Sequence, residues 1–80
     1  MGNVRRERPK RLGRKLLAVR QRLGVSQTEM ANRLKLKTYT VISSYEHGTR
    51  EPNLMTLLRY ARLIGVSMDV LVDDKLDLPD

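Results

Sequence analysis

The side chains with the clearest chemical potential in this sequence are its sixteen lysines and arginines, which outnumber nine aspartates and glutamates. Residues 1–15 hold seven basic side chains and one acidic, and residues 16–50 hold six and two. Residues 51–80 reverse the balance, with three basic side chains and six acidic. Cations bind phosphates, so the net charge of +7 indicates a nucleic acid partner ahead of an anionic membrane or an acidic protein.

Side chains that could support catalysis or bind a metal are few. The sequence has no cysteine, which excludes disulfides, zinc–thiolate sites and a cysteine nucleophile. His47 is the only histidine, and a lone histidine before a glycine is no metal site. We therefore expect no enzyme activity, no metal and no cofactor. The acidic end lacks the glycine turn and closing glutamate of a calcium loop, so we expect a solvated tail containing Asp73, Asp74, Asp77 and Asp80.

Helices must position the basic side chains, because no stretch of the chain alternates polar and apolar residues over a useful length. Gly24-Val25-Ser26 and Gly65-Val66-Ser67 each combine a helix-ending glycine with a serine N-cap. Ser26 and Glu29 also have the spacing of a capping box. Apolar periodicity predicts five short helices, near residues 12–23, 27–34, 39–46, 54–63 and 68–72.

Helices this short are marginal alone, so they must pack on one shared core. We expect residues 12–72 to form this all-α domain, between a basic flexible arm at residues 1–11 and an acidic tail at residues 73–80. Leu76 and Leu78 of the tail could pack back on the body, lie in a dimer interface or bind a partner. The expected core residues are Leu16, Val19, Leu23, Met30, Ala31, Leu34, Ile42, Leu57, Leu58, Ala61, Ile64 and Leu71.

Four motifs, in this order and at these separations, resemble the XRE/Cro helix-turn-helix family, which includes the lambdoid phage repressors. The motifs are Ser26-Gln27-x-x-Met30-Ala31-x-x-Leu34, Ile42-Ser43-x-Tyr45-Glu46-x-Gly48, Pro52-x-Leu54-x-x-Leu57 and Gly65-Val66-Ser67-x-x-x-Leu71. Each motif alone is weak, but the four together are specific and cover roughly residues 12–72. The resemblance implies a compact five-helix bundle of the lambda-repressor-like DNA-binding type. Its second and third helices would form the helix-turn-helix, with the third in the major groove.

The resemblance also implies roles for individual residues. Gln27 would contact a phosphate, Glu46 would form a structural ion pair with Arg20, and the exposed face of the third helix would read base edges. That face lacks Arg, Asn and Gln, so we expect weak direct readout supplemented by DNA shape or by the basic arm. The expected DNA-binding residues are Gln27, Lys35, Lys37, Thr38, Tyr39, Thr40, Ser43, Ser44 and Arg50.

The turn before the third helix departs from the family pattern. Lys35-Leu36-Lys37-Thr38 lacks the usual glycine after Leu34 and has one extra residue, so alignments from the two sides disagree by one position. We follow the alignment from Glu46 backward, which makes Thr38 the N-cap and turns Ile42 and Tyr45 inward. Without a glycine, any left-handed residue in this turn costs about 1 kcal/mol.

These observations predict a cytoplasmic transcriptional regulator, with double-stranded DNA as its partner and no membrane association. It would repress as a homodimer on a palindromic operator with half-sites about one helical turn (~34 Å) apart. An alternative is an antitoxin that neutralises a partner toxin through Leu71–Asp80 and uses DNA for autoregulation. A third interpretation, RNA binding, would show no preference for a duplex palindrome.

Overall fold

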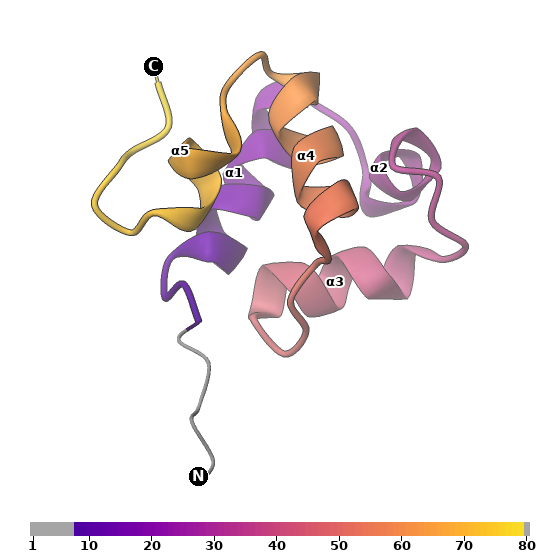
Figure 1. The fold of residues 1–80 in the computed structure, drawn as a ribbon. Helices are drawn as coiled ribbons and strands as arrows, with labels where there is room; N and C mark the ends of the chain where they lie inside the picture. The colour runs from indigo at the N-terminus through magenta and orange to yellow at the C-terminus, as the bar shows by residue number, and fades with distance from the viewer. Residues whose placement is uncertain (1–7, 80) are drawn as a thin grey trace, which may run out of the picture.

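The computed structural model describes residues 8–79, which fold into five α-helices and contain no strand (Figure 1). The prediction of an all-α five-helix bundle is therefore confirmed. Arg5, Arg6 and the other residues of the basic arm before Arg8 lie outside the described part, as does Asp80. None of the helices in the described part is long and apolar enough to cross a membrane. The helices are α1 (Leu12–Leu23), α2 (Gln27–Arg33), α3 (Tyr39–His47), α4 (Leu54–Leu63) and α5 (Met68–Val72).

The three residues predicted to cap helix N-termini differ in whether their side chains form the expected hydrogen bonds. Asn53 Oδ1 accepts from the Thr56 amide at 2.9 Å and so caps α4. Ser26 Oγ accepts from the Glu29 amide at 3.1 Å, but the Glu29 carboxylate accepts no described hydrogen bond from the Ser26 amide, so only half of the capping box forms. Ser67 occupies the N-cap of α5 without a side-chain cap bond.

One apolar core joins all five helices, and most of its predicted members are buried. Leu58 is a wrong prediction, because it lies half-exposed on the side of α4 that turns away from the core. Leu23 and Ile64 pack at the edge of the core instead of inside it. Tyr60 is completely buried, although it was not among the expected core residues. The core residues are Leu12, Leu16, Val19, Val25, Met30, Ala31, Leu34, Ile42, Tyr45, Leu57, Tyr60, Ala61 and Leu71.

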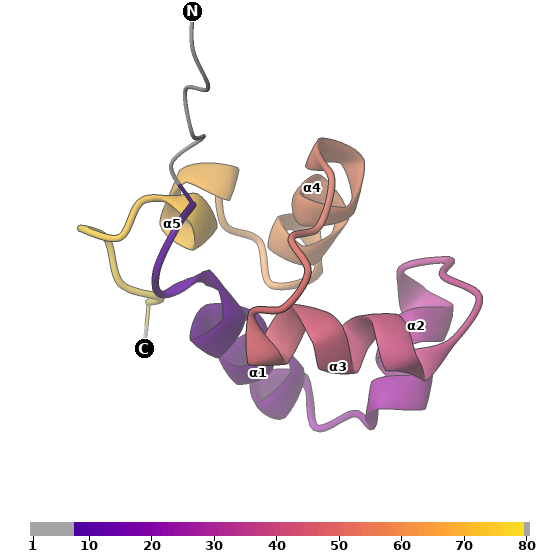
Figure 2. The ribbon, with the colours of Figure 1, turned by 90° about the horizontal axis from the view of Figure 1, so that it is seen from below.

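Helix α3 lies across one edge of the bundle, with α1 and α2 along one side and α4 on the other (Figure 2). The approach of α1 to α3 depends on Gly13. A Cβ atom at this position would lie 2.8 Å from the carbonyl oxygen of Glu46 and 2.9 Å from that of Tyr45. Both distances are shorter than real Cβ contacts, so α1 and α3 pack this closely only because residue 13 has no side chain.

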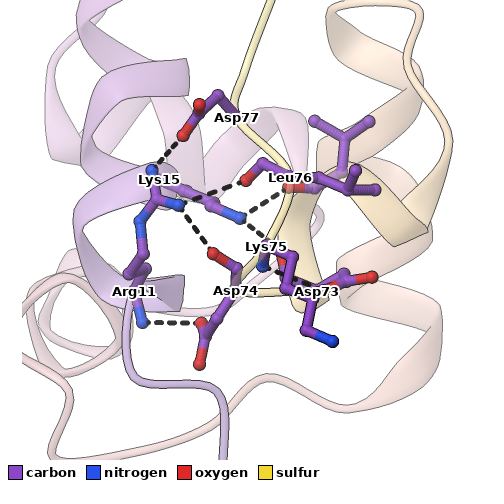
Figure 3. Close-up of polar contacts among 8 residues, drawn as sticks. Arg11, Lys15, Asp73, Asp74, Lys75, Leu76 and Asp77 are labelled. Carbon is purple, nitrogen blue, oxygen red and sulfur yellow. Dashed lines mark hydrogen bonds and ion pairs between the residues drawn. The ribbon is translucent and has the colours of Figure 1, made fainter.

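The acidic segment after α5 folds back against the start of α1, and we call residues 73–79 the C-terminal strap (Figure 3). The guanidinium of Arg11 donates to the carbonyl oxygen of Asp74 at 2.7 Å and forms an ion pair with Asp77. Leu78 packs against the core, whereas Leu76 is exposed. The segment therefore lies against α1 through Asp74 and Asp77, while the side chains of Asp73, Lys75, Leu76 and Asp77 are exposed to solvent.

Lysine 15 is the buried cation beneath this strap. Its side chain is only 4% exposed, and its Nζ donates to the carbonyl oxygens of Val70 at 2.9 Å and Asp73 at 2.8 Å. Burial lowers the pKa of Lys15, because the charged form loses solvation. The ammonium group thus satisfies carbonyls at the end of α5 that have no partner within that helix.

Candidate nucleic-acid interface

The turn between α2 and α3 contains a non-glycine residue with left-handed backbone, the conformation expected from the sequence to cost free energy there. Lys35 has φ +60° and is the only non-glycine residue with positive φ in the described part of the chain. Its amide donates to the Asn32 carbonyl at 3.1 Å, and the Leu36 amide donates to the Ala31 carbonyl at 2.8 Å. These two bonds form a Schellman motif. The equivalent left-handed positions after α1, α3 and α4 are glycines.

The start of α3 follows the alignment read backward from Glu46. Thr38 is the N-cap residue, with extended backbone, and Ile42 and Tyr45 are buried in the core. This confirms the predicted register of α3. The Thr38 hydroxyl does not cap the helix, because its oxygen lies 2.6 Å from that of Thr40, with which it shares a hydrogen bond.

The outward face of α3 presents Tyr39 and Thr40 most openly. Tyr39 is 53% exposed although it is a large aromatic residue, and Thr40 is exposed beside it. Ser43 and Ser44 are half-buried, and the Ser44 hydroxyl donates to the Thr40 carbonyl at 3.0 Å. The two residues at the start of α3 are therefore exposed to solvent, while its two serines are half-buried and hydrogen-bond groups of their own helix.

His47 was not among the expected DNA-binding residues, but it lies on α3 one turn after Ser43 and is exposed. Its Nδ1 atom lies 2.8 Å from the Ser43 carbonyl oxygen and 3.3 Å from the Ser43 hydroxyl. Because residues four apart lie on the same face of a helix, the spacing between Ser43 and His47 could have predicted that His47 lies on this face.

Exposed cations lie at both ends of α3. Lys35 and Lys37 are exposed in the turn before the helix, and Arg50 is exposed in the loop after it. Arg33, at the end of α2, is also exposed but was not predicted as a site residue. Arg8 comes from the other end of the sequence to the same loop, where its Nε lies 3.3 Å from Glu51 Oε2. The polar face of α3 therefore lies between two groups of positive charge.

An ion pair fixes α3 to the rest of the bundle. Arg20 of α1 donates from Nε to Glu46 Oε2 at 2.7 Å and from Nη2 to Glu46 Oε1 at 3.0 Å. A third donor of the same guanidinium reaches the Val25 carbonyl at 3.1 Å. The hydrogen bonds to Glu46 raise the pKa of Arg20. The Glu46 side chain is only 5% exposed, so this is a well-shielded, bidentate pair.

Gln27 joins this pair from the first residue of α2. Its Nε2 donates to Glu46 Oε1 at 3.1 Å, so one carboxylate connects α1, α2 and α3. A primary amide carries two hydrogens, and Glu46 takes one of them. The second hydrogen is available to another acceptor, which keeps Gln27 compatible with a phosphate contact.

The family model described as helix-turn-helix matches residues 16–71, which include α2, the Lys35 turn and α3. The chain belongs to the helix-turn-helix family. It is 38% identical over 61 residues to the HTH-type transcriptional regulator ImmR of Bacillus subtilis (strain 168), covering 76% of this chain and 47% of ImmR. It is 34% identical over 67 residues to the antitoxin HigA1 of Mycobacterium tuberculosis (strain ATCC 25618 / H37Rv), covering 84% of this chain and 44% of HigA1. The chain thus spans less than half of either relative.

Solved structures show the same fold. The P22 c2 repressor in complex with a synthetic operator superposes with a TM-score of 0.71 at 25% identity, covering 79% of this chain and 94% of that chain. The N-terminal DNA-binding domain of SinR from Bacillus subtilis gives a TM-score of 0.70 at 24% identity, covering 81% and 94%. The resemblance to the XRE and lambdoid repressor family is confirmed.

Proposed function

We propose that this chain is a sequence-specific DNA-binding transcriptional regulator that places α3 in the major groove. The observation that carries this proposal is the outward face of α3, where Tyr39 and Thr40 stand exposed between cations at both ends of the helix. A helix fits the major groove of B-DNA, and flanking cations set its position by binding phosphates. The likeness to the c2 repressor, solved with its operator, supports the same placement.

The role proposed for each residue depends on which of its hydrogen-bonding, apolar or charged groups is available to DNA. Tyr39 and Thr40 would contact base edges, through a hydroxyl or through a methyl against thymine. Ser43 and Ser44 would contribute only by redirecting hydroxyls that now face α3 itself. Thr38 would support Thr40, with which it shares a hydrogen bond. The residues assigned to phosphates are Gln27, Lys35, Lys37 and Arg50.

The proposed regulator acts as a repressor that binds a palindromic operator as a homodimer, in the cytoplasm where promoter DNA lies. It regulates by occupying DNA and not by catalysis. The operator complex of c2 is the supporting precedent for occupancy of this kind. A protein dimer with two-fold symmetry can place one recognition helix in each half-site of a palindromic operator when the half-sites are about one helical turn apart.

Selection of bound duplexes from a randomised DNA pool, at ~0.15 M salt, tests the proposal. We expect a two-fold motif to be enriched, with half-sites separated by about one helical turn. If no sequence is enriched and binding simply weakens as salt rises, the positive charge acts without readout and the proposal is wrong.

A second candidate function, neutralisation of a toxin, is favoured by the likeness to antitoxin HigA1. In the described part of the segment assigned to the toxin, Leu71–Asp80, Asp74 contacts the start of α1, and Leu76 is the exposed large apolar side chain. Co-expression with the product of the neighbouring gene tests this function. The function is supported if this chain restores growth to cells that express the neighbouring gene and the variant Leu76→Asp does not. It is contradicted if the product of the neighbouring gene does not impair growth.

A further inference from the structure

We propose that Arg59 of α4 is a positioning residue for DNA binding, which acts by holding the turn between α2 and α3 in the left-handed conformation found at Lys35. Its Nη1 atom donates to the carbonyl oxygen of Leu34 at 3.1 Å, across 25 positions of the sequence. Arg59 belongs to neither helix of the helix-turn-helix. The inference rests on the proposed function, because that function assigns phosphate contacts to the lysines of this turn.

The peptide group between Leu34 and Lys35 is held at both ends. Its carbonyl oxygen accepts from Arg59, and its N–H, which belongs to Lys35, donates to the Asn32 carbonyl at 3.1 Å. The φ angle of Lys35, +60°, is the rotation between this peptide plane and the rest of the residue. A non-glycine residue has lower energy at negative φ, so a less constrained peptide group would rotate in that direction. The bond from Arg59 opposes this rotation.

The turn that contains Lys35 differs from the other left-handed turns of the described chain. Those turns have Gly24, Gly48 and Gly65 at the left-handed position, where glycine has no steric cost. Within residues 8–79, no side chain donates to the carbonyl that precedes any of these three glycines. A side-chain donor is therefore found at the turn where left-handed backbone is unfavourable.

The guanidinium of Arg59 suits this position by its charge as well as by its reach. Leu34 is completely buried and is the C-cap of α2, where backbone carbonyls lack partners within the helix and carry partial negative charge. A cation is favoured there, and a hydrogen bond from a charged donor is stronger than one between neutral groups. Arg59 is half-buried, so water competes less for this bond than for one on an exposed side chain.

The turn held by Arg59 carries both lysines proposed to bind phosphates. Lys35 is the left-handed residue itself, and the exposed Lys37 comes directly before the N-cap Thr38. Rotation of the peptide group before Lys35 would therefore move both ammonium groups relative to the start of α3. Phosphate contacts fix the register of a protein on the duplex. Arg59 thus determines affinity through the turn and needs no contact with DNA of its own.

Amide hydrogen exchange of the full chain without DNA tests the structural step. Arg59→Met removes the charge and the donors, so exchange at the amides of Lys35 and Leu36, whose bonds form the turn, should become about tenfold faster. Arg62→Met, at an exposed arginine of the same helix, makes the same change in net charge and should leave both amides unchanged. Equal exchange in the three proteins would overturn the proposal, as would an equal acceleration at the core residue Val19.

Two further replacements keep the test decisive if Arg59→Met folds poorly. Arg59→Lys retains a cationic donor, whereas Arg59→Gln has a neutral one, and both residues are good helix formers. We expect the amides of Lys35 and Leu36 to exchange more slowly in Arg59→Lys than in Arg59→Gln. Equal exchange in these two variants would mean that no charged donor holds the turn, and the proposal would be wrong.

The salt dependence of DNA binding tests the functional step. With the selected duplex, Arg59→Met should lower the slope of log affinity against log salt by about 1 to 2, because the two lysines of the turn lose their phosphates. Arg62→Met should keep the slope of the wild type. A purely structural role of Arg59 would leave the slope of the folded variant unchanged, and this result would overturn the proposal.

A comparison of single and double variants separates positioning from a direct phosphate contact by Arg59. If Arg59 acts through the turn, Lys37→Ala should cost less affinity in an Arg59→Met chain than in the wild type, because the lysine is already displaced. Equal costs in the two backgrounds would show two independent contacts and would overturn the proposal.

The exchange experiment uses no DNA, so its failure is distinguishable from failure of the proposed function. A chain that selects a DNA motif but keeps its turn unchanged in Arg59→Met refutes the positioning role alone. A chain whose turn depends on Arg59 but that enriches no DNA sequence refutes the regulator, while the structural step stands.

Discussion

The backbone amide of Arg11 lies 3.0 Å from Oδ1 of Asp74, a residue 63 positions later in the chain. The same carboxylate accepts from the Lys10 amide at 2.9 Å, so Asp74 supplies the cap that α1 lacks in its own sequence. Lys15 of α1 makes the reciprocal contact with carbonyls at the end of α5. The C-terminal strap thus satisfies backbone amides at the start of α1, and α1 satisfies backbone carbonyls at the end of α5 (Figure 3).

We expect Asp74→Ala to lower the melting temperature at neutral pH. The two backbone hydrogen bonds, from Lys10 first and then Arg11, lower the pKa of Asp74 below its usual value. The stabilisation is therefore complete above the unfolded pKa of about 4 and is lost as pH falls through the lower folded pKa. Thermal unfolding of both proteins between neutral pH and about pH 2 checks this, and the gap in melting temperature should close on acidification.

Asp69→Ala is the matched control for this experiment. Asp69 is an exposed acid of α5 whose carboxylate has no described hydrogen bond. Its replacement should leave a smaller gap at neutral pH. A loss of stability equal to that of Asp74→Ala would show that general charge, and not capping of α1, is responsible.

Gly13→Ala should destabilise the fold by about 1–3 kcal/mol, because the new Cβ is forced against backbone and not against a flexible side chain. The α1–α3 spacing must open, so affinity for the selected DNA should fall as well. Urea unfolding and DNA titration measure the two effects. Arg14→Ala, at the exposed next position, controls for helix propensity, and a Gly13→Ala protein as stable as this control would contradict the packing account.

Glu46→Ala should cost about 3 kcal/mol, because it leaves the guanidinium of Arg20 unpaired in a poorly solvated site. It also removes the acceptor that orients Gln27. Glu29→Ala, an exposed acid on α2, should change stability by less than about 0.5 kcal/mol. Urea unfolding compares the two variants, and similar losses would mean that the Glu46 pair contributes no more than an ordinary surface charge.

Lys35→Gly should change stability and DNA affinity in opposite directions. Glycine removes the strain of the left-handed backbone at φ +60°, so we expect a gain of about 1 kcal/mol. The loss of one phosphate contact should lower the slope of log affinity against log salt by about 1. Lys37→Ala removes a charge without relieving strain, so it should weaken DNA binding with no gain in stability. A Lys35→Gly protein of unchanged stability would show that the turn is not strained.

Local sequence signals predicted most of the fold. Apolar spacing and glycine–serine corners gave helix bounds within one residue of those observed. The alignment from Glu46 fixed the register of α3, since burial of Ile42 and Tyr45 is a local periodic property. The prediction that Leu58 is buried was wrong because it rested on the same kind of local signal. Apolar spacing alone assigned this leucine of a short amphipathic helix to the core.

Contacts between distant segments could not be predicted in this way. The pairing of Asp74 with the start of α1 spans 63 residues, and neither periodicity nor composition carries that information. Burial of Lys15 is a similar case, since a lysine that directly follows Arg14 in a basic stretch is expected to be exposed. Within the site, the outward position of Tyr39 followed from register, but the hydrogen bond from Gln27 to Glu46 required the three helices to be assembled.

The most direct test of the DNA-reading role of α3 compares the affinities of the wild-type protein and one variant for two duplexes, one selected and one scrambled. Wild-type protein and the double variant Tyr39→Ala, Thr40→Ala are titrated with the selected duplex and with a scrambled duplex at ~0.15 M salt. Loss of base contacts worth about 1–3 kcal/mol should weaken binding to the selected duplex by about tenfold or more and leave the scrambled duplex unaffected. An unchanged ratio between the two duplexes would contradict the account, because sequence would then be read elsewhere than at the start of α3.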